Sequence, residues 1–176
     1  MTVNGQPADR RSIHRELERA RADLHHLVAS ATSTDLRRRT DGTRWTNQQM
    51  LWHMAFGYLI VSRLLTLVRL FGRLPEPISR SFAAMLNAGR RPFHHINYLG
   101  AVGGALVFHG PRLTRQLDRT ISRLHRRLDA ESEAALARRM HFPVGWDPFF
   151  RDTMTLEEVY HYGTQHYDFH RAQLTL

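Results

Sequence analysis

Apolar residues recur at spacings of three and four along four long stretches of the chain, which is the pattern of amphipathic helices. In residues 9–31 and 111–139, arginine and acidic residues separate the members of the apolar stripe. Residues 47–72 are apolar around most of the helix circumference, as in the central helix of a bundle. A last helix is predicted over residues 156–174. Because no stretch alternates convincingly between apolar and polar residues with a period of two, we predict an all-α protein.

Two of these helices begin with a capping box, in which a Ser or Thr is followed three residues later by Glu or Gln. Thr46 and Gln49 mark the start of the second long helix, and Thr155 and Glu158 mark the start of the last one. Pro111 suits the first turn of the third helix, where the missing N–H of proline has no partner to lose. These signals support the predicted starts of three of the four helices.

The connections between the helices predict the topology. Residues 1–8 are predicted to be a flexible tail, and residues 9–176 a single domain. A short helix is expected over 79–88, whereas 91–110, with a proline and several glycines, is expected to be loop-like. A second loop, rich in aromatic residues, covers 141–150. Four long helices with one long crossover between the second and the third predict a four-helix bundle.

The composition excludes several kinds of site and partner. The 176 residues contain no cysteine, which excludes disulfides and thiolate ligands and fits a cytoplasmic protein. All 25 basic residues are arginine, the net charge is +9, and the arginines are scattered, so we expect no specific nucleic-acid partner. The amino-terminal residues show no export signal. Arg63 and Arg69 interrupt the most apolar helix, so no membrane span is expected.

Three of the twelve histidines stand out as candidate metal ligands. His166 and His170 are four residues apart on the last predicted helix, so both rings lie on one face. His161, five residues before His166, points elsewhere. His53 lies near the start of the most apolar helix, where an unpaired polar ring is costly to bury. From the residues alone, half-buried imidazoles without a metal, and for His53 a core histidine bonded to a carbonyl, remain alternatives.

Two segments resemble the DinB-like family of metal-dependent proteins, which includes the DinB and YfiT types. They are DGTRWTNQQMLWHMAFGYL in the second helix region and QHYDFHRAQL near the end of the chain. The resemblance implies an up-down-down-up four-helix bundle that holds one divalent metal ion on His53, His166 and His170. Zinc and nickel suit imidazole ligands best, and iron and manganese remain open. The crossover over 75–110 is longer than is usual in the family, so no role is transferred to it.

The resemblance also implies a class of function. Three histidine ligands leave a coordination position open, which is typical of a catalytic site. Characterised members include transferases and isomerases that use a thiol such as mycothiol or bacillithiol. The chain is therefore expected to be a metal-dependent enzyme acting on a small molecule, with a mycothiol-type thiol as a candidate cofactor. A metal-dependent hydrolase, and a metal-binding stress-response or interaction protein without catalysis, are the alternatives. A homodimer formed through the crossover is left open.

Four residues are predicted to line a pocket above the ion. Tyr162 lies one helical turn before His166 on the same stripe. His95 and Asn97 in the crossover, and Trp146 in the aromatic loop, belong to the long segments that are able to cover the site. We expect an apolar cavity rimmed by aromatic residues and suited to a small organic electrophile or metabolite.

No general acid or base is assigned. Glu157 and Glu158 are interpreted as capping groups at the start of the last helix. Asp147 is interpreted as a turn residue before Pro148 in preference to a pocket residue. Gln173 follows the histidine stripe. It is expected to support the metal ligands without binding the ion, through a hydrogen bond to the backbone.

Overall fold

The computed structural model describes residues 9–176, so the predicted tail over 1–8 lies outside the described residues. Helices make up most of this part of the chain, which confirms the prediction of an all-α protein. The elements, in chain order, are α1 (Arg10–Ser30), α2 (Ser33–Arg37), α3 (Asn47–Phe71), α4 (Glu76–Ala88), α5 (Arg90–Val107), α6 (Gly110–Asp129), α7 (Glu133–Leu136), β1 (Arg139–His141), β2 (Thr153–Thr155) and α8 (Leu156–Arg171).

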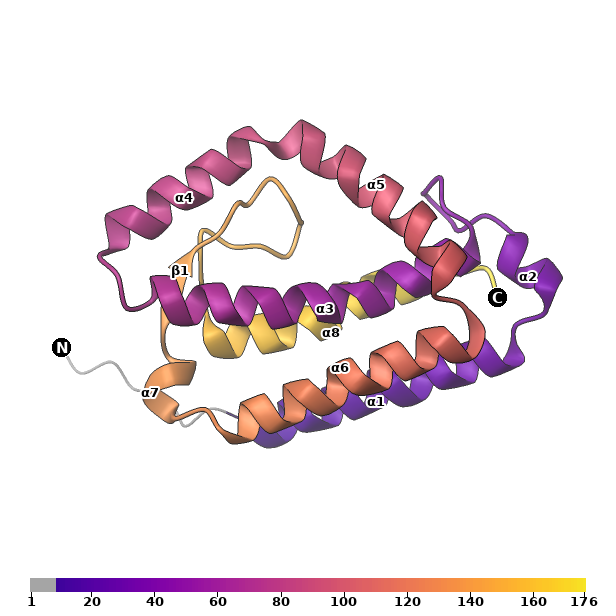
Figure 1. Cartoon of the computed structure of the whole chain (residues 1–176), viewed down its shortest axis with the longest axis horizontal. Coiled ribbons are helices and arrows are strands. Elements are labelled where there is room, and N and C mark those ends of the chain that lie inside the picture. The colour runs from indigo at the N-terminus through magenta and orange to yellow at the C-terminus, as the bar shows by residue number, and fades with distance from the viewer. Residues whose placement is uncertain (1–8) are drawn as a thin grey trace.

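The four longest helices of the body pack side by side (Figure 1). α3 packs against α8, α1 packs against α6, and contacts between α3 and α6 and between α1 and α8 join the two pairs. In Figure 1, α1 and α8 run from left to right, whereas α3 and α6 run from right to left. Helices α4 and α5 form an arch above this body, and the loop between β1 and β2 lies beneath the arch.

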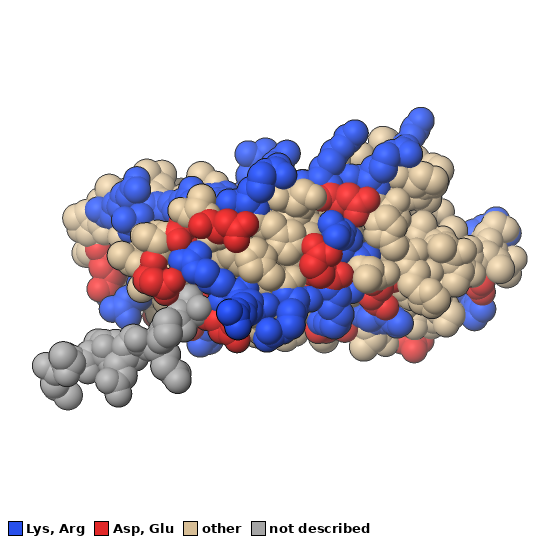
Figure 2. All heavy atoms as spheres, turned by 90° about the horizontal axis from the view of Figure 1, so that it is seen from below, with Lys and Arg blue, Asp and Glu red and all other residues tan. Residues whose placement is uncertain are grey.

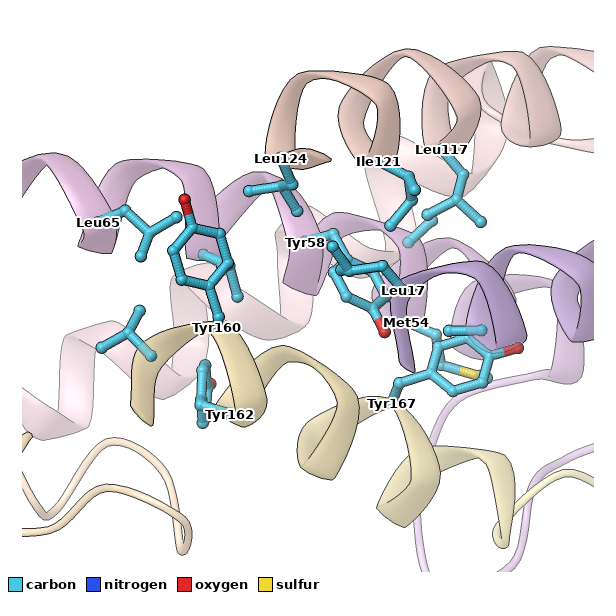
Figure 3. Packing of buried hydrophobic residues seen from close by; sticks show 14 of the residues in the cluster. Leu17, Met54, Tyr58, Leu65, Leu117, Ile121, Leu124, Tyr160, Tyr162 and Tyr167 are labelled. Carbon is cyan, nitrogen blue, oxygen red and sulfur yellow. The ribbon is translucent and has the colours of Figure 1, made fainter. Parts of the chain in front are cut away.

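The apolar stripes meet in one core between these helices. On α6 the predicted stripe is fully buried and faces α1 and α3. Three tyrosines, Tyr58, Tyr160 and Tyr167, are among the largest fully buried side chains. Figure 3 shows Tyr160 and Tyr162 on opposite sides of α8, with Tyr160 among the core residues. One face of α8 therefore packs in the core, and the opposite face, which carries Tyr162, is turned to the loop between β1 and β2.

Helix α3 begins as predicted and runs through the middle of the molecule. The Thr46 side chain accepts a hydrogen bond from the Gln49 N–H, and the Gln49 side chain accepts one from the Thr46 N–H. In length and hydropathy α3 alone among the described helices qualifies as a membrane span. Much of its surface, however, is buried against α5, α6 and α8. This is the environment of a core helix.

The prediction of a loop over 91–110 is wrong, because all but the last three of these residues belong to α5. Pro92 lies in the first turn of α5, where proline does not interrupt helical hydrogen bonds. Gly104 lets α5 approach α3 closely, because a Cβ at this position would lie 2.0 Å from Nε1 of Trp52. Trp52 Nε1 also donates a hydrogen bond to the carbonyl of Gly100 at 3.2 Å. Gly104 therefore serves helix packing, and the glycines of this segment lie in a helix and not in a loop.

Three other boundaries differ from the prediction. The third long helix ends at Asp129 instead of continuing to about residue 139. Ser132 then caps the short helix α7, and β1 follows, paired antiparallel with β2 through His141 and Thr153. Strands of three residues are too short to produce a readable alternation, so the sequence pattern missed them. The short helix predicted from residue 79 begins earlier, at Glu76, and the last helix ends at Arg171 instead of residue 174.

The aromatic loop between β1 and β2 is held against the arch. The Gly145 N–H donates to Oδ1 of Asn87 at 2.8 Å, and Nε1 of Trp146 donates to the carbonyl of Leu86 at 2.8 Å. The rings of Trp146 and Phe93 stack, with centroids 3.8 Å apart. These contacts join the loop to α4 and α5. They thereby fix the position of Asp147, which follows Trp146.

Candidate metal centre

The start of α3 fixes the first histidine. His53 lies two turns into α3 and is 5% exposed. The capping box holds the first turn, and Asn47 ties it to distant segments, because its Nδ2 donates to the carbonyl of Asp35 and to Oγ1 of Thr175. The Thr175 N–H donates in turn to Oδ1 of Asn47. The end of the chain is thus hydrogen-bonded to the helix turn that precedes His53.

Helix α8 supplies the other two histidines, and a glycine on α3 makes room for one of them. His166 is 6% exposed and packs against α3 at Gly57. A Cβ at position 57 would lie 2.8 Å from Nδ1 of His166, so a larger residue there would displace the ring. On α8, Gly163 allows similarly close packing against Tyr58. The two glycines let α3 and α8 approach closely enough for their histidines to meet.

The three histidines form one cluster. The ring centroids of His53 and His166 are 5.1 Å apart, those of His53 and His170 are 4.7 Å apart, and those of His166 and His170 are 4.5 Å apart. One nitrogen from each ring lies within 4.8 Å of the other two. This separation is compatible with three imidazole nitrogens around a single ion.

Burial favours the neutral form of each ring, which is the form that binds a metal. Burial, followed by the charges of His166 and His170, lowers the pKa of His53 well below its usual value. Burial, with the charge of His170, lowers the pKa of His166 to about 3. Burial also lowers the pKa of His170, against the opposing effect of a hydrogen bond to Gln173. All three rings are therefore neutral at pH 7.

The hydrogen bonds of the rings fit a metal centre. Nδ1 of His53 and Nδ1 of His166 are buried without a hydrogen-bond partner within residues 9–176. Nδ1 of His170 instead binds Oε1 of Gln173 at 2.7 Å, which leaves Nε2 of His170 for an ion. Gln173 thus lies behind a candidate ligand as expected, although its side chain contacts the ring and not the backbone. Such contacts orient metal-binding histidines.

Aromatic rings surround the cluster. The Trp45 ring lies 4.5 Å from the ring of His53 and 6.2 Å from that of His170. The Phe169 ring lies 5.1 Å from that of His170. From α5, Tyr98 stacks on Trp45 at 6.4 Å. Tyr98 therefore connects α5 to the aromatic rings that contact the histidines.

Asp147 faces the cluster, contrary to its interpretation as a turn residue only. Its Oδ1 does accept a turn hydrogen bond from the Phe149 N–H at 2.9 Å. Its Oδ2 accepts a hydrogen bond from the Tyr162 hydroxyl at 3.0 Å and lies 3.8 Å from Nε2 of His166. Burial raises the pKa of Asp147 and also raises that of Tyr162 well above its usual value. Sequence reasoning missed this role because the turn before Pro148 explained the aspartate by itself.

The structure places the four predicted pocket residues in different surroundings. Tyr162 lies beside the cluster, with its ring centroid 5.8 Å from that of His166. Trp146 is turned to the arch, where it binds Leu86 and stacks on Phe93. His95 is exposed on α5 and Asn97 is half-buried, and within the described part of the chain neither forms a hydrogen bond or ring contact with the three histidines.

The other nine histidines have different environments. Five of them bind carboxylates: His14, His25, His125, His141 and His161. His161 points away from the cluster, as predicted, and binds Glu16. The remaining four are exposed on the surface: His26, His94, His95 and His109. The three clustered histidines, by contrast, are buried or half-buried, and within 9–176 none of them forms a hydrogen bond to a carboxylate.

Two hollows lie away from this cluster. One, of about 430 Å³, lies between the end of α3, the start of α4 and the two strands, beside His141. The other, of about 660 Å³, lies between Asn87 and Gly145. None of the three histidines lines either hollow. We base the candidate site on the chemistry of the histidine cluster, because neither hollow brings together comparable ligands.

Comparison with known proteins identifies the family. The family model described as the DinB superfamily matches residues 16–174, a stretch that includes the three histidines, Tyr162 and Asp147. No curated protein and no solved structure matched the chain. The family match spans most of the sequence and confirms the resemblance seen in the two short segments. The chain belongs to the DinB superfamily.

Proposed function

We propose that this protein is an enzyme that binds one divalent metal ion on His53, His166 and His170 and acts on a small molecule. The observation that carries the proposal is the cluster of three neutral imidazoles, each with one nitrogen within 4.8 Å of the other two. Three protein ligands leave a coordination position open for a substrate or water. Zinc and nickel are the first candidates, and iron and manganese follow.

For the reaction, we propose transfer or isomerisation with a thiol of the mycothiol type. A bound ion supplies Lewis acidity, which lowers the pKa of a thiol or water and polarises a carbonyl. The protein residues provide the rest of the site: Gln173 orients His170, and the rings of Trp45 and Phe169 pack against the ring of His170. The absence of cysteine suits a reducing compartment, so we propose a cytoplasmic location.

Metal analysis of the purified protein tests the first part of this proposal. We expect about one zinc or nickel ion per chain in the wild type and a large loss of metal in His166→Ala, since removing one of three ligands leaves too few donors. His26→Ala is the matched control, because His26 is exposed and lies outside the cluster. Equal, substoichiometric metal in the wild type and His166→Ala would overturn the metal centre.

A conjugation assay tests the reaction class. Metal-loaded protein is incubated with mycothiol, bacillithiol or glutathione and the electrophile 1-chloro-2,4-dinitrobenzene. We expect acceleration with a thiol of the mycothiol type and loss of that acceleration in His166→Ala. If the protein binds metal but accelerates no thiol reaction, and instead hydrolyses 4-nitrophenyl acetate, the thiol proposal fails and the hydrolase alternative replaces it.

A further inference from the structure

Asp147 is held rigidly at the edge of the histidine cluster. Both of its oxygens have fixed partners, the Phe149 N–H on Oδ1 and the Tyr162 hydroxyl on Oδ2. Its side chain is only 14% exposed. The preceding residue, Trp146, is bonded to the carbonyl of Leu86. The carboxylate therefore keeps its place through contacts with the loop, α4 and α8, and not through the histidines.

The charge of Asp147 has no arginine partner among the described residues, although the chain contains 25 arginines. The other strongly buried acid, Glu131, illustrates the usual arrangement, because Arg69 and Arg127 both form ion pairs with it. Asp147 instead faces the ring of His166, and no arginine of the described chain is paired with it. A buried carboxylate without a cation is costly, and a divalent ion on the histidines would supply the missing positive charge.

The position of Asp147 indicates how it acts toward that ion. Its Oδ2 lies 3.8 Å from Nε2 of His166, which is beyond hydrogen-bond distance. The group of ligand atoms that lie within 4.8 Å of one another contains the three histidines and not Asp147. The carboxylate thus lies beside the histidine cluster and outside the set of candidate ligand atoms.

We propose that Asp147 accepts a hydrogen bond from the non-protein ligand on the metal ion and thereby selects ligands that carry a proton, such as water or an undissociated thiol, over anions. This inference rests on the proposed metal centre. A fixed carboxylate accepts an O–H or S–H bond and repels an anion at the same position. The Tyr162 hydroxyl has a positioning role, because it orients Oδ2.

Azide binding to the cobalt-substituted protein tests this selection. Co²⁺ bound by three histidines absorbs in the visible range, so both Co²⁺ and azide are titrated without an activity assay. In Asp147→Asn the negative charge is lost and the shape is retained. We expect azide to bind about tenfold more tightly and Co²⁺ about tenfold more weakly than in the wild type, the magnitude typical of groups that act behind metal ligands.

Asp152→Asn is the matched control for charge. Asp152 belongs to the same connection between β1 and β2, is exposed, and pairs with His141 away from the cluster. Its substitution should leave azide affinity unchanged. If Asp147→Asn does not fold, Asp147→Ser, which keeps an acceptor for the Phe149 N–H, replaces it.

The outcomes separate this inference from the metal proposal. If the wild-type protein binds no Co²⁺, the proposed function fails. If Co²⁺ binds and azide affinity is the same in the wild type and Asp147→Asn, the role of Asp147 is wrong and the metal centre stands. If Asp147→Asn weakens Co²⁺ binding but leaves azide affinity unchanged, Asp147 only orients His166 and the selection proposal is also wrong.

Discussion

Three neighbouring imidazoles, two buried and one half-buried, are costly to remove from water unless something compensates for their lost hydration. In His53 and His166, one ring nitrogen is buried without a hydrogen-bond partner in the described chain. Elsewhere in the molecule buried or half-buried histidines bind acids, as His141 binds Glu76 and Asp152. The contrast sets the clustered rings apart from the other histidines and is compatible with a bound metal ion.

This cost predicts how the stability of the metal-free protein depends on pH. The pKa of His166 is about 3 in the folded protein, against an ordinary value of 6.5 in the unfolded chain. Below pH 6.5 the unfolded chain therefore binds a proton that the folded protein does not. His166 should leave stability unaffected above pH 6.5 and reduce it progressively from pH 6.5 down to about pH 3.

The His166→Gln variant measures this effect. Its free energy of unfolding, determined in urea after removal of metal, should depend less steeply on pH than that of the wild type. The difference should approach about 1.4 kcal/mol per pH unit within this window. His26→Gln, which removes an exposed histidine, is the control. Parallel curves for the wild type and His166→Gln would contradict the assignment of a buried neutral ring.

At the residue scale, some of the site could be read from the sequence and some could not. The spacing of His166 and His170 places two rings on one face of a helix, and this follows from helix geometry alone. Gly57 carried a weaker signal: it lies one turn after His53 in an apolar helix, where glycine is costly without a packing reason. The signal of Asp147 was ambiguous, because a turn before Pro148 also explains it and only the folded chain brings its loop to His166.

At the scale of elements, α5 is the clearest difference between expectation and structure. Pro92 and the glycines are ordinary signs of a loop, and the prediction of a loop over 91–110 followed from them. Tertiary contact decides the outcome, because Trp52 of α3 lies across Gly104 and binds the carbonyl of Gly100. A glycine needed for close packing and a glycine needed for a turn look alike in a single sequence.

The docking of α5 predicts a difference between two adjacent glycines. In Gly104→Ala the new Cβ would lie 2.0 Å from Nε1 of Trp52, so α5 must move away from α3. We expect a loss of about 1–3 kcal/mol in the free energy of unfolding, as for other overpacked sites. In Gly103→Ala the new Cβ meets nothing within 4 Å, and alanine favours a helix over glycine. Gly103→Ala should therefore be neutral or stabilising.

Urea unfolding of the two variants, followed by circular dichroism, checks this prediction. Tryptophan fluorescence provides a second measurement, because Trp52 loses its packing against α5 only in Gly104→Ala. Equal stability of the two variants would show that α5 is not held by this contact.

At the scale of the whole molecule, the positive charge is large but dispersed. On the face shown in Figure 2, arginines are interleaved with acidic residues and do not merge into one continuous patch. Several arginines are engaged in ion pairs, among them Arg19 with Asp168 and Arg171 with Asp23. A net charge of +9 attracts polyanions at long range, whereas sequence-specific binding requires side chains gathered on an element that fits a groove.

We therefore predict weak nucleic-acid binding that depends on salt and not on sequence. For each phosphate contacted, the logarithm of the binding constant should fall by about 0.9 per logarithmic unit of salt. Three such contacts would weaken binding by roughly 40-fold between 50 and 200 mM salt. Arg126→Gln, which removes an exposed arginine from α6, should reduce the salt slope by at most about 0.9.

Fluorescence anisotropy with two unrelated duplexes of equal length measures both the salt dependence and the sequence dependence of binding. If one duplex binds tightly and this binding persists at physiological salt, the prediction is wrong and the protein has a sequence-specific nucleic-acid-binding surface.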